Sequence, residues 1–132
     1  MFDEIRDKET WSPWETKSLS RFIPISNGCD NFCTYCVVPH TRGPLVCRGH
    51  KEILKEIKES ASKKIKEIWL LGENVNKYEF KNQKSKIKIN FAKLLKMADA
   101  MPGDFKIRFM SPNPADFTDE LIDTMAKCQK VA

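Results

Sequence analysis

Three of the five cysteines lie within eight residues, at Cys29, Cys33 and Cys36, with three and two residues between them. In a chain without a secretory signal, such a group favours metal binding over a disulfide framework. A four-iron cubane held by three thiolates leaves one iron without a protein ligand, and an open metal position can bind a substrate. The spacing therefore predicts an iron–sulfur cluster with one open iron.

Zinc is the alternative metal for these thiols. A zinc ion would need a fourth ligand, which His40, Cys47 or His50 could supply. Structural zinc sites usually combine two separated pairs of ligands, whereas this chain has one triplet and no second pair. We therefore rank zinc below the cluster.

Composition and charge are those of an ordinary globular chain, with 132 residues, 41% of them apolar and 31% charged. No apolar run approaches the roughly 20 residues of a membrane helix. The acidic start lacks the regions of a signal peptide, so we expect a cytoplasmic protein. The net charge of +5 suits contact with RNA phosphates, and equally a solvated surface. With the lysines at 81, 84, 86 and 88, that charge supports a different class, a zinc-binding RNA-binding module.

Hydrophobic patterning predicts the elements that must position the cysteines. Three apolar runs are predicted strands, at 21–25, 65–71 and 105–110. Three amphipathic segments are predicted helices, at 50–62, at 91–101 and after the capping residue Thr118. Their predicted buried faces are Ile53, Leu54, Ile57 and Ala61; Phe91, Leu94, Leu95 and Ala98; and Leu121, Ile122 and Met125.

Two longer connections are predicted loops. The cysteine segment from 27 to about 46 contains two glycines and two prolines, which disfavour regular structure there. Residues 77–90 are polar, with a short extended piece near Ile87 and Ile89. Pro24 suggests that the first strand lies at an edge of its sheet.

Strands alternating with helices predict an α/β fold with about three βα units and parallel strands. Three units make an open sheet or part of a barrel. Loops that follow parallel strands share one end of the sheet, where such folds bind ligands. We therefore expect the cysteines, Gly72-Glu73-Asn74 and Ser111-Pro112-Asn113 to meet. Residues 1–20 are interpreted as a linker or entering arm, and 21–132 as the domain.

Three motifs carry a family resemblance over about residues 21 to 127. The cysteine motif continues as Val37-Val38-Pro39-His40-Thr41-Arg42-Gly43-Pro44, followed later by Leu70–Tyr78 and Ile107–Phe117. Together they resemble the radical SAM methylthiotransferases. Within that family they are most similar to the branch that acts on N6-isopentenyladenosine in tRNA.

The resemblance implies a fold, two cofactors and a reaction. The fold would be the N-terminal part of a radical SAM (βα) barrel. The three cysteines would ligate a [4Fe-4S] cluster, whose fourth iron binds the amine and carboxylate of S-adenosyl-L-methionine. Gly72, Glu73 and Asn74 would meet that amine, largely through backbone, and Tyr35 would add an apolar wall. A 5′-deoxyadenosyl radical would then take hydrogen from C2 of the nucleoside, where sulfur and a methyl group are installed.

The resemblance also implies partners and an incomplete site. Family members are several times longer, with an upstream domain for a second cluster and a downstream RNA-binding domain. They act on the anticodon stem-loop of tRNA and need an electron donor such as a flavodoxin or ferredoxin. We therefore expect this chain to be inactive in thiolation on its own, with the third strand an unpaired edge. Threonylcarbamoyl adenosine in tRNA and a ribosomal-protein aspartate are the alternative substrates.

A few positions differ from the family pattern or leave their role open. Glu73 stands where glutamine is usual, and Cys47 where serine is usual. We do not expect Cys47 to be a ligand, because a small residue there more often packs against the loop. His40 is a loop residue that could touch substrate. Arg42 and Arg48 could pair with a carboxylate, a phosphate or the cluster's charge, or form structural salt bridges.

Overall fold

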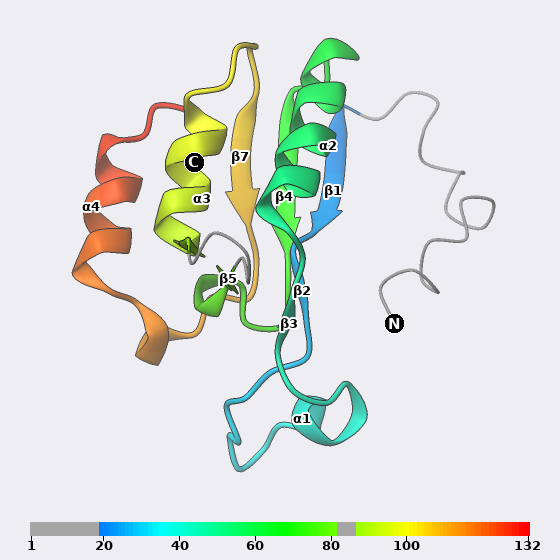
Figure 1. Ribbon diagram of the computed structural model, residues 1–132, viewed down its shortest axis with the longest axis vertical. Coiled ribbons are helices and arrows are strands. Elements are labelled where there is room, and N and C mark those ends of the chain that lie inside the picture. The colour runs from blue at the N-terminus through cyan, green and yellow to red at the C-terminus, as the bar shows by residue number, and fades with distance from the viewer. Residues whose placement is uncertain (1–18, 82–86) are drawn as a thin grey trace, which may run out of the picture.

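The computed structural model describes residues 19–81 and 87–132 (Figure 1). The expected arm at 1–20 lies outside the described residues, apart from its last two, and Ser20 already belongs to the first strand. The central sheet has three parallel strands in the order β1–β4–β7: β1 Ser20–Pro24, β4 Glu67–Leu71 and β7 Lys106–Phe109. The predicted α/β fold is confirmed, with β1 at an edge and no closed barrel within the described residues.

The strand register places apolar side chains of all three strands on one face. Ile23 pairs with Leu70, and Ile68 pairs with Ile107. These residues form the core with apolar residues of two helices, all of them fully buried: Ile23, Ile68, Leu70, Ile107, Ile53, Ile57, Leu94 and Leu95. Burial of each such side chain stabilises the fold by about 1.5–3 kcal/mol.

Three helices follow the strands, as predicted: α2 His50–Ser62, α3 Phe91–Asp99 and α4 Asp119–Lys127. Helix α2 lies across β1 and β4, and α4 packs against the outer side of α3 (Figure 1). The predicted cap of the last helix is confirmed, because Thr118 Oγ1 accepts a hydrogen bond from the Leu121 N–H at 3.2 Å.

The opposite face of the sheet carries an aromatic and cationic row. Phe22 pairs with Trp69 in the register, and their rings stack with centroids 6.2 Å apart. Arg108 lies opposite Trp69 on β7, with its guanidinium carbon 5.7 Å from the Trp69 ring centroid. The two faces therefore differ, with the aliphatic one under the helices and the aromatic one away from them.

Both predicted loops contain regular structure. The cysteine segment begins and ends in an antiparallel pair, β2 Ser26–Asn27 with β3 Val46–Cys47, and includes the helical turn α1 Val38–Thr41. The expectation of an irregular loop was therefore wrong at these places. Pro39 does not break α1, because it lies in the first turn, where a proline sacrifices no helical hydrogen bond.

The second loop contains a small hairpin. The 3₁₀ turn η3, Val75–Lys77, leads into β5 Glu79–Lys81, which pairs with β6 Lys88–Asn90. The predicted extended piece near Ile87 and Ile89 is confirmed as β6. Lys84 and Lys86 lie outside the described residues.

The last helix differs from its predicted face. Leu121 is buried and Met125 packs against the core, but Ile122 is 52% exposed. Thr124 takes the expected place of Ile122, because positions 121, 124 and 125 share one side of a helix. Its hydroxyl is satisfied inside the helix by the Glu120 carbonyl at 2.6 Å.

The third strand is not the unpaired edge that was expected. Residues after α4 run alongside β7, so that Val131 forms a parallel bridge with Ile107. The Ile107 N–H donates to the Lys130 carbonyl at 2.7 Å, and the Ala132 N–H donates to the Ile107 carbonyl at 3.0 Å. The last residues therefore cover part of this edge.

The described helices are all too short or too polar to cross a lipid bilayer.

Candidate functional site

The cysteine loop leaves the sheet at the end of β1 and is closed by the β2–β3 pair. Ser26 pairs with Cys47, and Asn27 pairs with Val46. The Ile25 N–H donates to the Leu71 carbonyl at 2.8 Å, so the base of the loop is also attached to the end of β4. Figure 1 shows the loop extending past the strand ends as a separate lobe that includes α1.

Gly28 lets the two limbs of this loop, the segment that follows β2 and the segment that precedes β3, approach each other closely. Its φ is +79°, and an added Cβ would lie 2.2 Å from the Pro44 carbonyl oxygen. The next N–H, that of Cys29, donates to the Gly43 carbonyl at 3.2 Å. Both the positive φ and the crowded backbone require glycine at this position.

The three motif cysteines are free thiols in different surroundings. Cys29 is only 8% exposed, whereas Cys33 and Cys36 are partly exposed. The Asn31 N–H donates to Cys29 Sγ at 3.4 Å. Tyr35, the predicted apolar wall, is 90% exposed, so its role stays a prediction.

The other two cysteines are placed differently. Cys47 accepts a hydrogen bond from the Glu79 N–H at 3.4 Å, and burial, with smaller contributions from nearby carboxylates, raises the pKa of its thiol. It packs against the hydrophobic core, whereas packing against the loop was expected. Cys128 follows α4, whose C-terminal end lies away from the cysteine loop (Figure 1), and burial beside Asp99 raises the pKa of its thiol.

The loop after β4 contacts the cysteine loop through Gly72 and Glu73. A Cβ on Gly72 would lie 2.3 Å from Ser26 Oγ, so the two segments touch at this glycine. Glu73 Oε2 accepts the Gly28 N–H at 3.0 Å, and its other oxygen lies 3.8 Å from Arg42 Nε. In this arrangement the Glu73 carboxylate holds both limbs of the cysteine loop.

Asp116 is the point where the loops after all three strands meet. Its Oδ2 accepts the side-chain amide of Asn31 at 2.7 Å and that of Asn74 at 2.6 Å. Lys77 Nζ donates to Asn31 Oδ1 at 2.8 Å. Burial acts to raise the pKa of Asp116, but these amide hydrogen bonds and the charge of Lys77 outweigh it, so the pKa is lowered. We name Asn31, Asn74 and Asp116 the Asp116 junction.

A second contact ties the loop after β4 to the loop after β7. The Asn76 side-chain amide donates to the Asn113 carbonyl at 2.8 Å, and the Asn113 N–H donates back to Asn76 Oδ1 at 2.8 Å. The Val75 N–H donates to the Ser111 carbonyl at 3.3 Å. The predicted convergence of the three loops is therefore confirmed.

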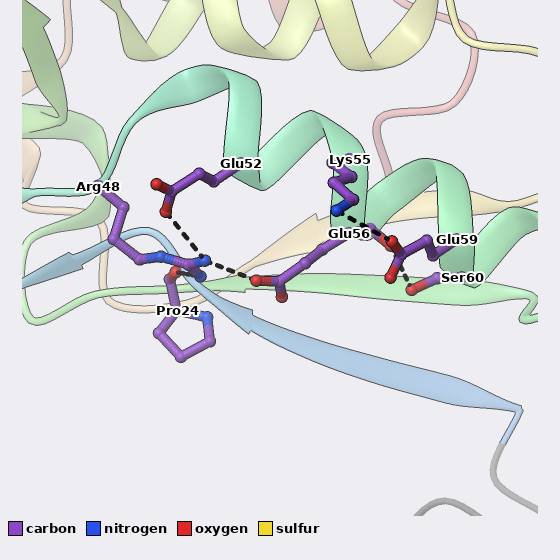
Figure 2. Close-up of polar contacts among 7 residues, drawn as sticks. All are labelled: Pro24, Arg48, Glu52, Lys55, Glu56, Glu59 and Ser60. Carbon is purple, nitrogen blue, oxygen red and sulfur yellow. Dashed lines mark hydrogen bonds and ion pairs between the residues drawn. The ribbon is translucent and has the colours of Figure 1, made fainter. Parts of the chain in front are cut away.

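Arg48 is a structural residue at the end of the cysteine loop. Its guanidinium donates to the Pro24 carbonyl at 2.8 Å and to Glu56 at 2.5 Å, and Glu52 lies 3.7 Å away. Figure 2 shows the guanidinium between β1 and α2. The side chain is only 13% exposed, so these contacts are partly shielded from water. Its own carbonyl accepts the Tyr78 hydroxyl at 2.7 Å. Of the roles left open for Arg48, the structural salt bridge is therefore the one observed.

Arg42 and His40 have local contacts. Arg42 pairs with Glu73 at an exposed position, where such a pair contributes about 0–1 kcal/mol to the free energy of unfolding. The His40 ring meets the Phe32 ring edge-on, with centroids 6.0 Å apart. Both residues lie on the lobe that carries the cysteines.

Comparison with known sequences gives the family. The sequence profile of the Radical SAM superfamily matches residues 23–131. The chain belongs to the Radical SAM superfamily. It is 46% identical over 133 residues to the tRNA-2-methylthio-N(6)-dimethylallyladenosine synthase of Clostridium novyi (strain NT). The matched region covers 97% of this chain and 29% of that protein.

Two further relatives carry the same name. The protein of Treponema denticola is 48% identical over 83% of this chain and 25% of its own length. That of Alkaliphilus oremlandii is 43% identical over 99% of this chain and 28% of its own length. The chain thus spans between a quarter and three tenths of these relatives.

A radical SAM domain implies an iron–sulfur cluster and S-adenosyl-L-methionine, and the donor set fits a cluster. Three free thiols extend from one loop, and a cubane distributes its thiolates over different irons. A zinc ion would need its ligands around one point. Within residues 19–81 and 87–132, no group of three or more His, Cys, Asp or Glu side chains is arranged to hold a metal ion, so the fit rests on the type and spacing of the three thiols.

Sequence reasoning missed the residues that join the loops. Asn31 and Asp116 lie 85 positions apart, and neither belongs to a periodic pattern. Asn31 falls inside the cysteine motif, in which only the cysteines have a spacing that indicates a chemical role. The turn residues before Asp116 predicted a loop but gave no sign of its partner.

Proposed function

We propose that this chain bears the [4Fe-4S] cluster of a radical SAM methylthiotransferase. The observation that carries the proposal is the cysteine loop, which carries three free thiols and is joined to the loops after β4 and β7 through Gly28 and Asn31. The similarity to methylthioadenosine synthases supports the same reading. In this proposal Cys29, Cys33 and Cys36 hold the cluster and leave one iron open.

The residues around the thiols position the loop and the cofactor. When bound, the reduced cluster supplies the electron that cleaves S-adenosyl-L-methionine and starts radical chemistry. Glu73 fixes the backbone of Gly28 beside the first cysteine. Gly72 keeps the end of β4 close to Ser26, and Asn74 lies buried between the loops. We assign Gly72, Glu73 and Asn74 to the methionyl amine of the cofactor, and Tyr35 to its apolar surroundings.

The proposed substrate is N6-isopentenyladenosine beside the tRNA anticodon, with a methylthio group added at C2. Names of the relatives support this choice, and the net charge of +5 suits RNA. Threonylcarbamoyl adenosine and a ribosomal-protein aspartate are the competing substrates. The proposal includes a flavodoxin or ferredoxin as electron donor and a cytoplasmic location. Because the chain spans less than a third of these relatives, methylthio transfer is proposed for an enzyme with their additional regions.

Anaerobic reconstitution with iron and sulfide tests the cluster. We expect about four irons per chain and brown absorbance, lost when the three motif cysteines are replaced by alanine. A matched control replaces Cys47 and Cys128 instead and should retain the iron. One zinc per chain without iron would support the zinc-binding RNA module and contradict the proposal.

Formation of 5′-deoxyadenosine from S-adenosyl-L-methionine tests the reaction class. A thiolation assay with isopentenyl tRNA, threonylcarbamoyl tRNA and the ribosomal protein then tests the substrate, using an enzyme with all regions of the relatives. Thiolation of either competitor in preference to isopentenyl tRNA would contradict the substrate while leaving the cluster proposal intact.

A further inference from the structure

The Asp116 junction joins the cysteine loop to both other loops through one carboxylate oxygen. Asn31 comes from the loop after β1, Asn74 from the loop after β4, and Asp116 from the loop after β7. Asn74 is only 1% exposed, so its amide must find a partner inside the protein. Charge-assisted hydrogen bonds of this kind are the stronger ones in proteins.

Asn31 links this junction to a cysteine sulfur. Its side chain is held from both ends, because the amide donates to Asp116 and the Oδ1 atom accepts from Lys77. Its backbone N–H donates to Cys29 Sγ at 3.4 Å. Holding the side chain therefore restrains the same residue whose backbone donates to the sulfur.

We propose that Asp116 is a positioning residue that, through Asn31, keeps a backbone N–H on the Cys29 sulfur and fixes the cysteine loop over the strand ends. This inference rests on the proposed cluster function. Hydrogen bonds to cysteine sulfurs are among the factors that set the reduction potential of an iron–sulfur cluster. Asp116 thus acts on the cluster from a different βα unit, without being a ligand.

Experiments on the metal-free chain test the restraint itself. In Asp116→Ala we expect the Asn31 amide to exchange hydrogen, and Cys29 to react with an alkylating reagent, about tenfold faster or more, since two charge-assisted hydrogen bonds are lost. Asp116→Asn retains an acceptor oxygen and should stay close to the unsubstituted chain. Asp123→Asn, at an exposed position on α4, is the matched control and should change neither rate.

Asn31→Ala provides a second route if Asp116→Ala does not fold. It leaves the backbone N–H and the contact between Asn74 and Asp116, and it should also speed alkylation of Cys29. Circular dichroism establishes that each variant is folded. Unchanged exchange and alkylation in a folded Asp116→Ala or Asn31→Ala variant would overturn the proposal.

The reduction potential of the reconstituted cluster separates positioning from simple structural support. Asp116→Ala and Asp116→Asn both remove the carboxylate charge, but only the alanine variant removes the acceptor of the Asn31 amide. We therefore expect a lower potential in Asp116→Ala than in Asp116→Asn, because a donor to the sulfur stabilises the reduced cluster. Equal potentials would refute the positioning role. Failure of the unsubstituted chain to bind iron would instead contradict the proposed function, and the metal-free rates would then decide whether the restraint exists.

Discussion

Replacing Gly72 with alanine measures how closely the end of β4 approaches the cysteine loop. The new Cβ would lie 2.3 Å from Ser26 Oγ, far inside van der Waals contact, while the next nearest atoms, at 3.6 and 3.7 Å, make ordinary contacts. Gly72 does not have a positive φ, so the substitution causes steric strain and no backbone strain. Overpacking of this kind typically costs about 1–3 kcal/mol in the free energy of unfolding.

Ser26→Ala should relieve that strain. Within the described part of the chain, Ser26 Oγ is buried and has no hydrogen-bond partner, so its removal alone should stabilise the fold by about 1 kcal/mol. In the Ser26→Ala background, Gly72→Ala should be neutral, or stabilising by about 0.4–1 kcal/mol because alanine restricts the unfolded chain. The coupling energy between the two substitutions is then about 2 kcal/mol.

Urea denaturation followed by circular dichroism gives the four unfolding free energies of this cycle. The slope with denaturant should be the same for all four proteins, which shows that only stability changed. If Gly72→Ala costs as much in the Ser26→Ala background as in the original chain, Ser26 Oγ is not the atom that excludes a side chain at position 72. The explanation for this glycine would then be refuted.

Three further predictions concern the base and the junction of the site. Gly28→Ala should destabilise the chain by about 1–3 kcal/mol in urea denaturation, because both the positive φ and the Pro44 carbonyl exclude a Cβ; a neutral result would contradict the close approach of the two limbs. Arg48→Lys should lower the unfolding free energy by about 1 kcal/mol, since an ammonium cannot reach Glu56 and the Pro24 carbonyl with the same fork, and an unchanged midpoint would count against this clamp. Asp116 has a lowered pKa in the folded chain, so its carboxylate stabilises the fold above its ordinary pKa near 3.8 and this contribution is lost as pH falls through the folded value. Asp116→Asn should therefore lose less stability than the original chain between about pH 5 and 2, and parallel pH profiles for the two proteins would refute this account.

Long periodic segments were predictable because their own residues determine them. The spacing of Ile53 and Ile57 gave helix α2 with its observed ends, and Thr118 gave the start of α4. Ile122 was misassigned because the face of a nine-residue helix depends on its packing against α3 as well as on its pattern. Thr124 could join the core because it satisfies its hydroxyl within the helix.

Short elements were not predictable because tertiary contacts create them. The pair β2–β3 has two residues on each side, too few for any period, and it forms because both limbs are attached to the ends of β1 and β4. The bridge between Val131 and Ile107 is of the same kind.

The site was predicted where topology determines it and missed where single side chains do. Parallel strands with right-handed crossovers bring their following loops to one end, so the meeting of the cysteine loop with Gly72–Asn74 could be expected. The junction of Asn31 and Asp116 could not, because nothing local marks an asparagine in a motif as the partner of a distant carboxylate. Such pairings are properties of the folded chain.

The β2–β3 pair also has a consequence for the lifetime of a cluster on this loop. The pair brings residues 27 and 46 together, so the entropy lost in closing the loop is offset by folding and does not have to be offset by metal binding. Small zinc domains differ, because the metal holds them together and its removal unfolds them. Here the core lies under α2 and α3, and the three motif cysteines are not part of it. A cluster destroyed by oxygen would therefore leave a folded scaffold with its cysteines still gathered on one loop, ready for repair without a new round of folding.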